Sequence, residues 1–420
     1  MKLNIFSQFN SIVARSIAVM FGGTVLAQGI TFAVTPLLSR LFSPSDFGVL
    51  GAFVAILTIL ISFSSLKYEF AIPQVSTKKH SLELTVLCLY ILFAMSLLVA
   101  VSLFLLWAFD FYHADAYFWL LPLAVFFAGS FQVATYYSIK EKDFYLLSKA
   151  NVSRSSGQAV LQVLSGIFSL GGGALILSYV FSQALGSFEI LYRALKGFKF
   201  PSFLRLLVLC RKYIRFPKFS ASASTLNTAA TNSLPFLIIY FWSVGEAGLF
   251  ALTQRAMGVP MAFLGAAIAN VYLAELPRIL QRDPAEAKKF YIKSLRNLVL
   301  AGLPLIAVST LILFYYAEFI FGGEWFGISA LVIVLAPFFL GQFVASPLSQ
   351  TLNVIGRQDV QLIWDLCRLI VVLGCLVACG IYQVGFSVSI LIYSILMFFF
   401  YAVSVVVTLI LIDRNSLEVK

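Results

Sequence analysis

One arginine of this chain stands far from any acid in an apolar stretch. Arg255 lies in the segment GLFALTQRAMGVP, residues 248–260, inside a mostly apolar run that extends from Gly245 to Asn270. No acidic residue occurs within one helical turn of it on either side. A guanidinium binds phosphate through a planar fork of parallel N–H donors and keeps its charge at physiological pH. Arg255 is therefore a candidate ligand for an anion.

Another apolar segment, residues 221–241, carries many hydroxyl side chains, two amides and a proline. The amides are Asn227 and Asn232, and Pro235 follows them. Within lipid, amides and a proline-freed backbone carbonyl are tolerated where they line a cavity or meet another helix. We predict that Asn227 and Asn232 line a cavity. Close helix packing through small residues is the alternative explanation for the serines.

The first apolar segment, residues 14–38, repeats this pattern with Gln28, three threonines and Pro36. Gln254 directly precedes Arg255. We predict that Gln28 and Gln254 belong to the same substrate-binding group as Arg255.

Four charged residues are candidates for gating or ion coupling. Lys67 and Glu69 directly follow the apolar segment at residues 47–66. Asp365 and Arg368 lie three residues apart in the apolar segment at residues 361–381. The i,i+3 spacing also fits a simple ion pair within one helix. A carboxylate at such a place can carry a proton or bind sodium, and the sequence favours neither ion.

The composition requires a lipid environment for the elements that hold these residues. Of 420 residues 61% are hydrophobic and 11% charged, with a mean hydropathy of +0.96. About 20 helical residues cross a bilayer core, and continuous apolar runs favour helices over strands. We predict an all-α polytopic membrane protein of about twelve transmembrane helices, at residues 14–38, 47–66, 82–109, 117–138, 148–168, 173–193, 221–241, 246–270, 292–316, 327–352, 361–381 and 386–411.

Common signatures of enzymes and metal sites are missing from the sequence. It has no GxxxxGK[ST], GxGxxG, HExxH or GxSxG pattern, and no cysteine stands at metal-ligand spacing from a histidine. The longest predicted outer turn has about ten residues, which is too short for the catalytic loop of a membrane polymerase or ligase. We expect a protein that is not an enzyme and uses no cofactor or metal.

The basic residues gather on one side of the predicted membrane. The segments on that side hold 27 of the 29 lysines and arginines, and the exceptions are Arg40 and Arg255. The opposite turns carry acids such as Asp46, Asp110 and Glu324. The positive-inside rule therefore predicts that both termini are cytoplasmic.

The two halves of the chain repeat one another at an offset of 200 residues. Ser43 matches Ser243, Asp46 matches Glu246 and Gly48 matches Gly248. This repeat predicts two parallel six-helix lobes around a central cavity. We expect an N-terminal lobe at residues 1–196, a basic cytoplasmic connector at 197–218 and a C-terminal lobe at 219–420.

The connector mixes basic residues with Phe198, Phe203, Leu204 and Leu207. Such a segment suits the anionic cytoplasmic leaflet of a membrane, and we expect no nucleic acid partner.

Three stretches resemble bacterial polysaccharide flippases, which move O-antigen or capsule repeat units. They are TPLLSRLFSPSDFGVLGAF, YYSIKEKDFYLLSKANVSR and LNTAATNSLPFLIIYFWSVGEAGLFALTQRAMGVP. The resemblance implies the fold of the multidrug/oligosaccharidyl-lipid/polysaccharide exporter superfamily. It also implies a cavity lined with cations, to which Arg255 and Arg40 would contribute.

The resemblance further implies the substrate and the partners. The substrate would be a polyprenyl-pyrophosphate-linked oligosaccharide for lipopolysaccharide, capsule or exopolysaccharide synthesis, turned to the outer leaflet of the bacterial inner membrane by alternating access. Membrane lipid, a polysaccharide polymerase and a chain-length regulator would be its partners. The alternative is an ion-coupled small-molecule or drug antiporter of the same fold.

Overall fold

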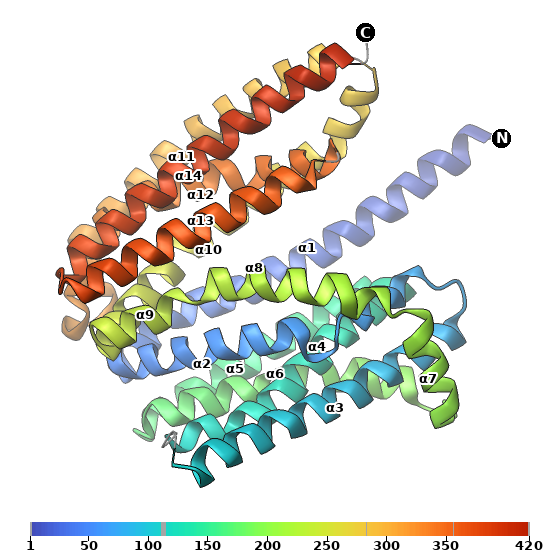
Figure 1. Ribbon diagram of the computed structural model, residues 1–420, viewed down its shortest axis with the longest axis horizontal. Coiled ribbons are helices and arrows are strands. Elements are labelled where there is room, and N and C mark those ends of the chain that lie inside the picture. The colour runs from blue at the N-terminus through green and yellow to red at the C-terminus, as the bar shows by residue number, and fades with distance from the viewer. Residues whose placement is uncertain (1, 111–114, 283, 356, 419–420) are drawn as a thin grey trace. The chain divides into compact units, whose positions relative to one another are not determined.

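The computed structural model describes residues 2–110, 115–282, 284–355 and 357–418, and in these ranges it contains helices and no strand (Figure 1). The long helices are α1 (Lys2–Leu41), α2 (Pro44–Ser64), α3 (Lys78–Ala108), α4 (Leu121–Glu141), α5 (Phe144–Ile167), α6 (Gly171–Leu195), α10 (Val244–Arg282), α11 (Pro284–Phe321), α12 (Gly327–Val354), α13 (Gln358–Ile381) and α14 (Phe386–Glu418). Shorter elements are η1 (Tyr68–Gln74), η2 (Ala116–Leu120), α7 (Phe203–Lys212), η3 (Phe216–Ala221), α8 (Ser222–Asn232), α9 (Leu234–Phe241) and η4 (Gly323–Trp325).

The all-α polytopic prediction is confirmed, because each predicted span falls on a helix or on two consecutive helices. In the described ranges, nine helices are long and apolar enough to cross a membrane. The predicted spans 148–168, 221–241 and 246–270 are not among those nine. These three spans carry the polar residues Arg154, Asn232 and Arg255.

The predicted span at residues 221–241 is interrupted near its proline. The structure breaks it into α8 and α9 around Ser233. Pro235 has no N–H to donate to the carbonyl four residues earlier, so it cannot continue the ladder of α8. A π-helical turn, η3, precedes α8.

The chain divides into two compact units. Unit 1 comprises residues 1–42 and 49–233, and unit 2 comprises residues 43–48 and 234–420. The lobe boundaries at residues 196 and 219 remain a prediction.

In unit 1, α1 and α5 run parallel and pack closely. A methyl group on Gly23 would lie 1.7 Å from Ser148 Oγ, and one on Gly166 would lie 2.8 Å from Leu41 Cβ. Both contacts join residues 125 positions apart, so the two helices keep the same register over this length. A core of side chains from η1, α3, α4, α5, α6 and α7 packs at the end of the unit where α3 begins, and includes Ile72, Leu84, Cys88, Val133 and Leu209.

In unit 2, the repeated residues of the sequence form two matching helix caps. At the start of α2, the Ser43 hydroxyl donates to Asp46 Oδ2 at 2.8 Å and accepts from the Asp46 amide at 3.3 Å. At the start of α10, the Ser243 hydroxyl donates to Glu246 Oε2 at 3.2 Å and accepts from the Glu246 amide at 3.1 Å. At α2 the Ser43 amide also donates to Asp46 Oδ2 at 3.0 Å, which completes a capping box. In both helices the serine hydroxyl satisfies an amide left free at the helix start.

The two capped helix starts also contact each other symmetrically. A methyl group on Gly48 would lie 2.0 Å from the Val244 carbonyl oxygen, and one on Gly248 would lie 1.8 Å from the Pro44 carbonyl oxygen. These partners are themselves related by the offset of 200 residues. The repeat therefore encodes a two-fold symmetric crossing of backbones that only glycine permits.

Replacing either crossing glycine by alanine should destabilise the protein. The obstacle is backbone rather than a movable side chain, and overpacking of this kind costs about 1–3 kcal/mol. We expect Gly48→Ala and Gly248→Ala each to lower the melting temperature in detergent by roughly 5 °C. Gly374→Ala is the matched control, because a methyl group there meets nothing within 4 Å. Unchanged melting of both variants would contradict the crossing.

Candidate functional site

Unit 2 contains a pocket of about 400 Å³ between α10 and α12. Gly258, Met261, Gly265 and Ala269 supply its wall on α10, and their spacing places them on one face of that helix. The volume lies within the usual range of ligand pockets. A methyl group on Gly258 would meet nothing within 4 Å, so this part of the wall is bare backbone.

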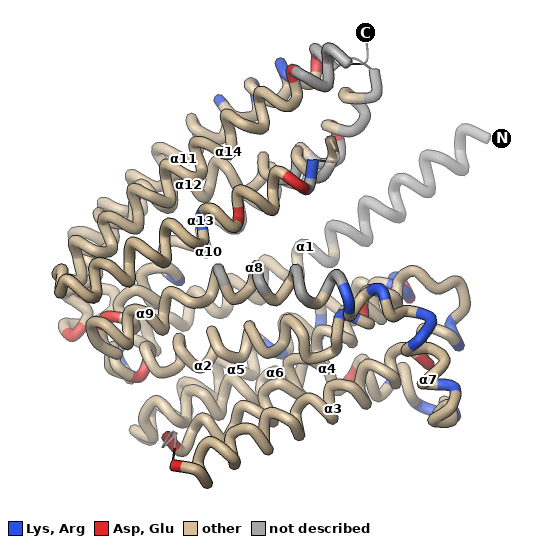
Figure 2. Tube along the Cα trace, viewed as in Figure 1, with Lys and Arg blue, Asp and Glu red and all other residues tan. Residues whose placement is uncertain are grey.

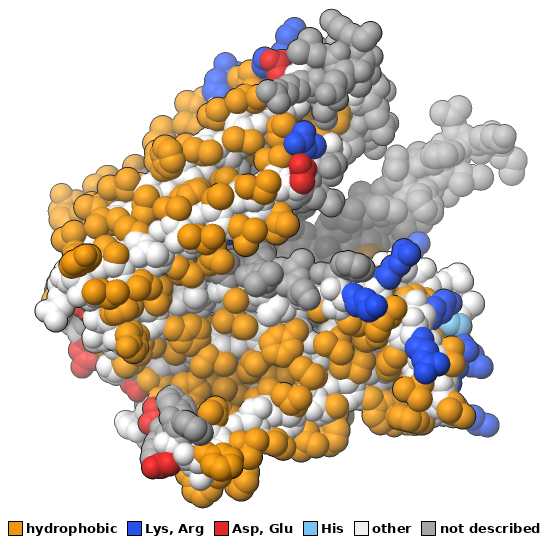
Figure 3. Space-filling view, viewed as in Figure 1, with side chains coloured by type: hydrophobic (Ala, Val, Ile, Leu, Met, Phe, Trp, Pro, Cys, Tyr) orange, Lys and Arg blue, Asp and Glu red, His pale blue; other side chains and the backbone are white. Residues whose placement is uncertain are grey.

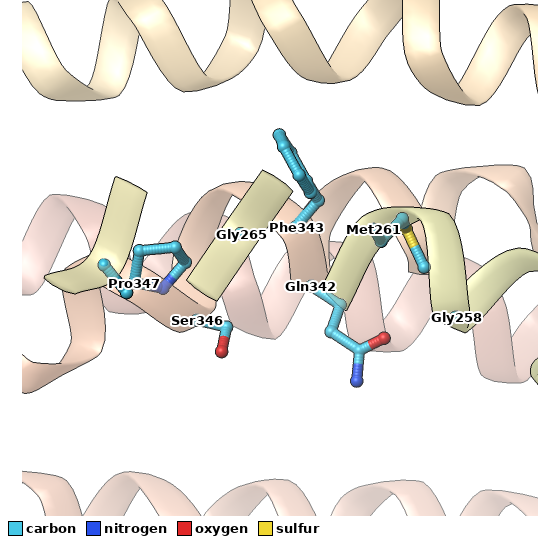
Figure 4. A pocket seen from close by; sticks show the side chains of 8 residues that line it. Gly258, Met261, Gly265, Gln342, Phe343, Ser346 and Pro347 are labelled. Carbon is cyan, nitrogen blue, oxygen red and sulfur yellow. The ribbon is translucent and has the colours of Figure 1, made fainter. Parts of the chain in front are cut away.

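The α12 wall combines polar and apolar groups. Gln342 and Ser346, one helical turn apart, point to the same side, and Phe343 points to the opposite side (Figure 4). Phe343 is buried, and its ring would contact a methyl group placed on Gly302 of α11 at 2.7 Å. Pro347 within α12 cannot donate to the carbonyl of Phe343, which leaves that oxygen available as an acceptor.

Arg255 and Gln254 lie one turn before this pocket on α10. Gln254 precedes Gly258 by four residues and Met261 by seven, which places it on the pocket-lining face. Arg255, three residues before Gly258, lies on the edge of that face. Arg255 is half-buried and about 16 Å along α10 from Val244. The structure thus places these two predicted residues one helical turn before the residues that line the pocket, and a binding role for them remains a prediction.

Our sequence reasoning missed Gln342 and Ser346. Both lie in the predicted span 327–352, and the candidate membrane span Gly323–Ser349 that contains them has an 18-residue stretch of mean hydropathy 2.2. The spacing of Gln342, Ser346 and Pro347 was the available signal, since amide, hydroxyl and proline also marked the segment 221–241.

The remaining predicted substrate-binding residues lie elsewhere in the chain. Gln28 is exposed on α1, and Asn232 donates from Nδ2 to the Thr228 carbonyl at 2.9 Å within α8. The side chain of Asn227, also on α8, lies outside the described residues. Arg40 is exposed in the last turn of α1. All four belong to unit 1, whereas Arg255 and Gln254 belong to unit 2.

Lys67 and Glu69 form a buried cluster between α2 and α3. Glu69 has no exposed surface, and the Ser65 hydroxyl donates to its Oε2. Gln132 Nε2 of α4 donates to Glu69 Oε1 at 3.0 Å, and Lys67 Nζ lies 3.8 Å from the same oxygen. The side chain of Lys67 is only 6% exposed. The structure therefore joins the two predicted charges to Gln132, which the sequence did not identify.

The backbone at this cluster is strained and its charges are desolvated. Leu66 and Lys67 have positive φ angles of 51° and 60°, which are uncommon for residues other than glycine. Burial raises the pKa of the Glu69 carboxyl, although Ser65 and Lys67 oppose this. Burial also lowers the pKa of Lys67. Both groups are thus shifted toward their neutral forms.

Asp365 and Arg368 form the ion pair that their spacing indicates. Arg368 Nη2 lies 3.0 Å from Asp365 Oδ1 within α13, and Gln361 Nε2 donates to Asp365 Oδ2 at 3.1 Å. The Arg368 guanidinium also stacks on Trp364, with 4.6 Å between Cζ and the ring centre. A gating or coupling role for this pair remains a prediction.

Arg154 is a half-buried cation of α5. The charge count groups it with the basic residues of the preceding loop, and the structure places it ten residues into α5, about 15 Å from the helix start. Its guanidinium carbon lies 4.5 Å from the centre of the Phe131 ring, and Nη1 donates to Gln183 Oε1 at 3.2 Å. Arg154 thereby ties α5 to α4 and α6. The spacing of Arg154, Gln158 and Gln162 along one face was the signal.

The comparisons with known proteins agree with this architecture. The sequence model of the family described as "Polysaccharide biosynthesis protein" matches residues 37–330. Comparison with curated protein sequences yields no match.

Solved transporter structures share the fold. An inward-facing multidrug resistance MATE family transporter of the MOP superfamily superposes with a TM-score of 0.68 at 16% identity, covering 94% of both chains. The lipid II flippase MurJ, in an inward closed conformation, gives 0.68 at 11% identity over 96% of this chain and 91% of MurJ. A MOP superfamily transporter from Pyrococcus furiosus gives 0.56 at 14% identity over 96% of both chains.

The buried carboxyl of Glu69 should make stability depend on pH. Because its pKa is raised on folding, the folded protein holds a proton that the unfolded chain releases above its ordinary pKa of 4.5. The contribution of Glu69 to the free energy of unfolding is present below pH 4.5. It is lost as the pH rises through the pKa that Glu69 has in the folded protein. Glu69→Gln should remove that loss, so its melting temperature should gain about 2 °C or more on wild type between pH 4.5 and 7.

The control is Glu324→Gln, which removes an exposed carboxylate from η4. If the Glu69→Gln and wild-type melting curves kept a constant separation over this pH range, Glu69 would not be the titrating group.

Replacing Arg154 should loosen the packing of α4, α5 and α6. Arg154→Met removes the contact with Phe131 and leaves Gln183 Oε1 without its donor, at a cost of about 1–3 kcal/mol. Denaturation in detergent should show this loss, and Arg154→Lys should recover only part of it. Arg193→Met, at an exposed arginine of α6, is the control. Equal stability of the two methionine variants would contradict the assigned contacts.

Proposed function

The chain belongs to the family of polysaccharide biosynthesis proteins, and on that basis we propose that it is a flippase for polyprenyl-pyrophosphate-linked oligosaccharide repeat units. The observation that carries this proposal is the position of Arg255 on α10, one helical turn before the residues that line the α10–α12 pocket. The anionic group of such a substrate is a pyrophosphate, and arginine is the side chain best suited to bind it.

The groups around the pocket suit the two chemically different parts of this substrate. Arg255 would hold the pyrophosphate by charge-assisted hydrogen bonds. Gln254, Gln342 and Ser346 provide the uncharged donors and acceptors that sugar hydroxyls require. The polyprenyl chain would remain in the bilayer throughout, so no polar site has to accept it. The protein would move its substrate by alternating access and make or break no covalent bond.

We propose that the basic side of the protein faces the cytoplasm of a bacterial inner membrane, with both termini there. Within unit 1, Lys and Arg gather at one end of the helices (Figure 2). Helix α3 begins with Lys78 and Lys79 and is followed at its other end by Asp110. This distribution is the one that the positive-inside rule relates to orientation. O-antigen, capsule and exopolysaccharide units are all candidate substrates, and a polymerase and a chain-length regulator would act on the delivered product.

Glu69 is the group that we propose for coupling transport to protons. It is fully buried, its pKa is raised by burial, and it lies in the strained segment that joins α2 to α3. A change in its protonation would alter its bonds with Ser65, Gln132 and Lys67 together. Asp365, held by Arg368 within one helix, is the second candidate.

An antiporter of small molecules or drugs is the competing function, since multidrug transporters share the fold. Exporters of cationic drugs require acids deep in the membrane. The charged residues nearest the middle of α5 and of α10 are Arg154 and Arg255, both basic. This sign of charge favours an anionic substrate.

The proposal predicts that Arg255→Ala abolishes export of the repeat unit without preventing membrane insertion. Loss of a charge-assisted hydrogen bond to phosphate costs about 1.5–3 kcal/mol, which weakens binding roughly 10- to 100-fold. The measurement is complementation of a flippase-null strain with a defined glycan, read as surface polysaccharide, with membrane levels of the protein measured in parallel.

Arg255→Lys should restore export only partly, because lysine lacks the planar fork of donors. Lys289→Ala, at an exposed cation of α11, is the control for loss of one positive charge. Normal surface polysaccharide in the Arg255→Ala strain would contradict the assignment of Arg255. Failure of the wild-type protein to support any glycan, together with export of a cationic drug, would contradict the flippase itself.

A further inference from the structure

The short helix α7, Phe203–Lys212, lies crosswise at the end of unit 1 where α3 begins (Figure 1). One of its faces is part of the protein core. Leu206 and Leu209 are buried there against side chains of η1 and α3, and the Tyr68 hydroxyl donates to the Cys210 carbonyl at 3.0 Å. The orientation of α7 about its own axis is therefore fixed by packing.

An ion pair fixes α7 further. Arg205 donates from Nε and Nη2 to Glu83 Oε2 of α3, at 3.2 and 3.0 Å. The Glu83 side chain is only 6% exposed, so this is a held contact rather than a mobile surface pair. The Ser202 hydroxyl accepts from the Arg205 amide and caps the start of α7. Rotation of the helix would break all of these contacts together.

The opposite face of α7 exposes large apolar side chains. Phe203 and Leu204 are 73% and 74% exposed, and Leu207 and Val208, one turn later, are also exposed. Phe200, just before the helix, is exposed as well. A surface of this kind on a helix of 10 residues, too short to cross a bilayer, indicates an apolar partner.

Exposed cations surround this apolar face. They are Lys196, Lys199, Arg211, Lys212, Arg215 and Lys218, and the sequence contains no acid between Glu189 and Glu246. Blue and orange side chains accordingly intermingle over this end of the unit in Figure 3. Among the described residues, Arg205 is the one basic residue of α7 with a carboxylate partner, the buried Glu83.

We propose that α7 is a membrane-surface helix whose exposed face inserts among anionic phospholipid headgroups. Apolar side chains on one face, flanked by lysine and arginine, are the features by which amphipathic helices lie in a bilayer interface. Each cation near an anionic leaflet strengthens such binding about five-fold. The charge complementarity selects anionic lipid over an acidic or apolar protein, because a lipid surface satisfies the apolar face and the cations together.

The core contacts give this binding a mechanical consequence. Since Leu206, Leu209 and Arg205 attach α7 to α3 and η1, the lipid surface and the buried Glu69 segment contact the same core. Anionic lipid is thus expected to hold the end of unit 1 at the level of the headgroups. This inference concerns a lipid site and stands independently of the proposed substrate.

The test is amide hydrogen exchange of the full-length protein in two nanodisc preparations. One contains phosphatidylcholine alone, and the other contains phosphatidylcholine mixed with phosphatidylglycerol. Exchange over residues 203–212 should be slower in the mixture. The variant Arg211→Gln/Lys212→Gln/Arg215→Gln should lose this difference, and its affinity for a short-chain phosphatidylglycerol should fall roughly 100-fold.

The matched control is Lys289→Gln/Lys293→Gln/Arg296→Gln, which removes three exposed cations from α11. This variant should keep the wild-type difference between the two lipid mixtures. Equal exchange of the wild-type α7 in both mixtures would overturn the proposal, as would equal affinity loss in the two triple variants. Rapid exchange in both mixtures would show that lipid does not cover the exposed face, which would then be left to a protein partner.

Discussion

The structure depends on one constraint, which is that lipid offers no hydrogen bonds to the backbone or to polar side chains. Helices satisfy their own backbone groups, and many hydroxyls bond back to them. Thr31, Thr35 and Thr253 each donate to a carbonyl four residues earlier, at 2.7–3.0 Å. A polar residue is therefore not by itself a sign of function in this fold. The informative places are those where the helical ladder is interrupted, at η1 and between α8 and α9.

The close approach of helices follows from the same constraint. In lipid, helices associate without a hydrophobic driving force, so van der Waals contact stabilises their packing. Small residues strengthen this contact because they allow the two backbones to approach closely. Gly48 and Gly248 provide this at the capped starts of α2 and α10, and Gly23 provides it between α1 and α5. The repeated serine and acid beside Gly48 and Gly248 have a structural role, because each serine caps its helix and bonds to the acid.

The charges within the helices differ in how they are accommodated. Arg154 stacks on Phe131 and binds Gln183, and Arg368 pairs with Asp365 one turn away. Both are held by neighbouring side chains within their own unit. Arg255 lies one helical turn before a pocket whose other wall carries an amide and a hydroxyl. Its position near a pocket is what makes it a candidate ligand.

The sequence alone determined the all-α membrane class, the positions of the helices, the repeat and the prominence of Arg255, because hydropathy and charge are properties of single segments. It also indicated the ion pair of Asp365 and Arg368, whose partners lie in one helix. Only the tertiary structure decided the partners of Arg154, the partners of Glu69 and the α10–α12 pocket. Each of these joins residues far apart in the chain, such as Glu69 with Gln132, and no local pattern encodes such a distance.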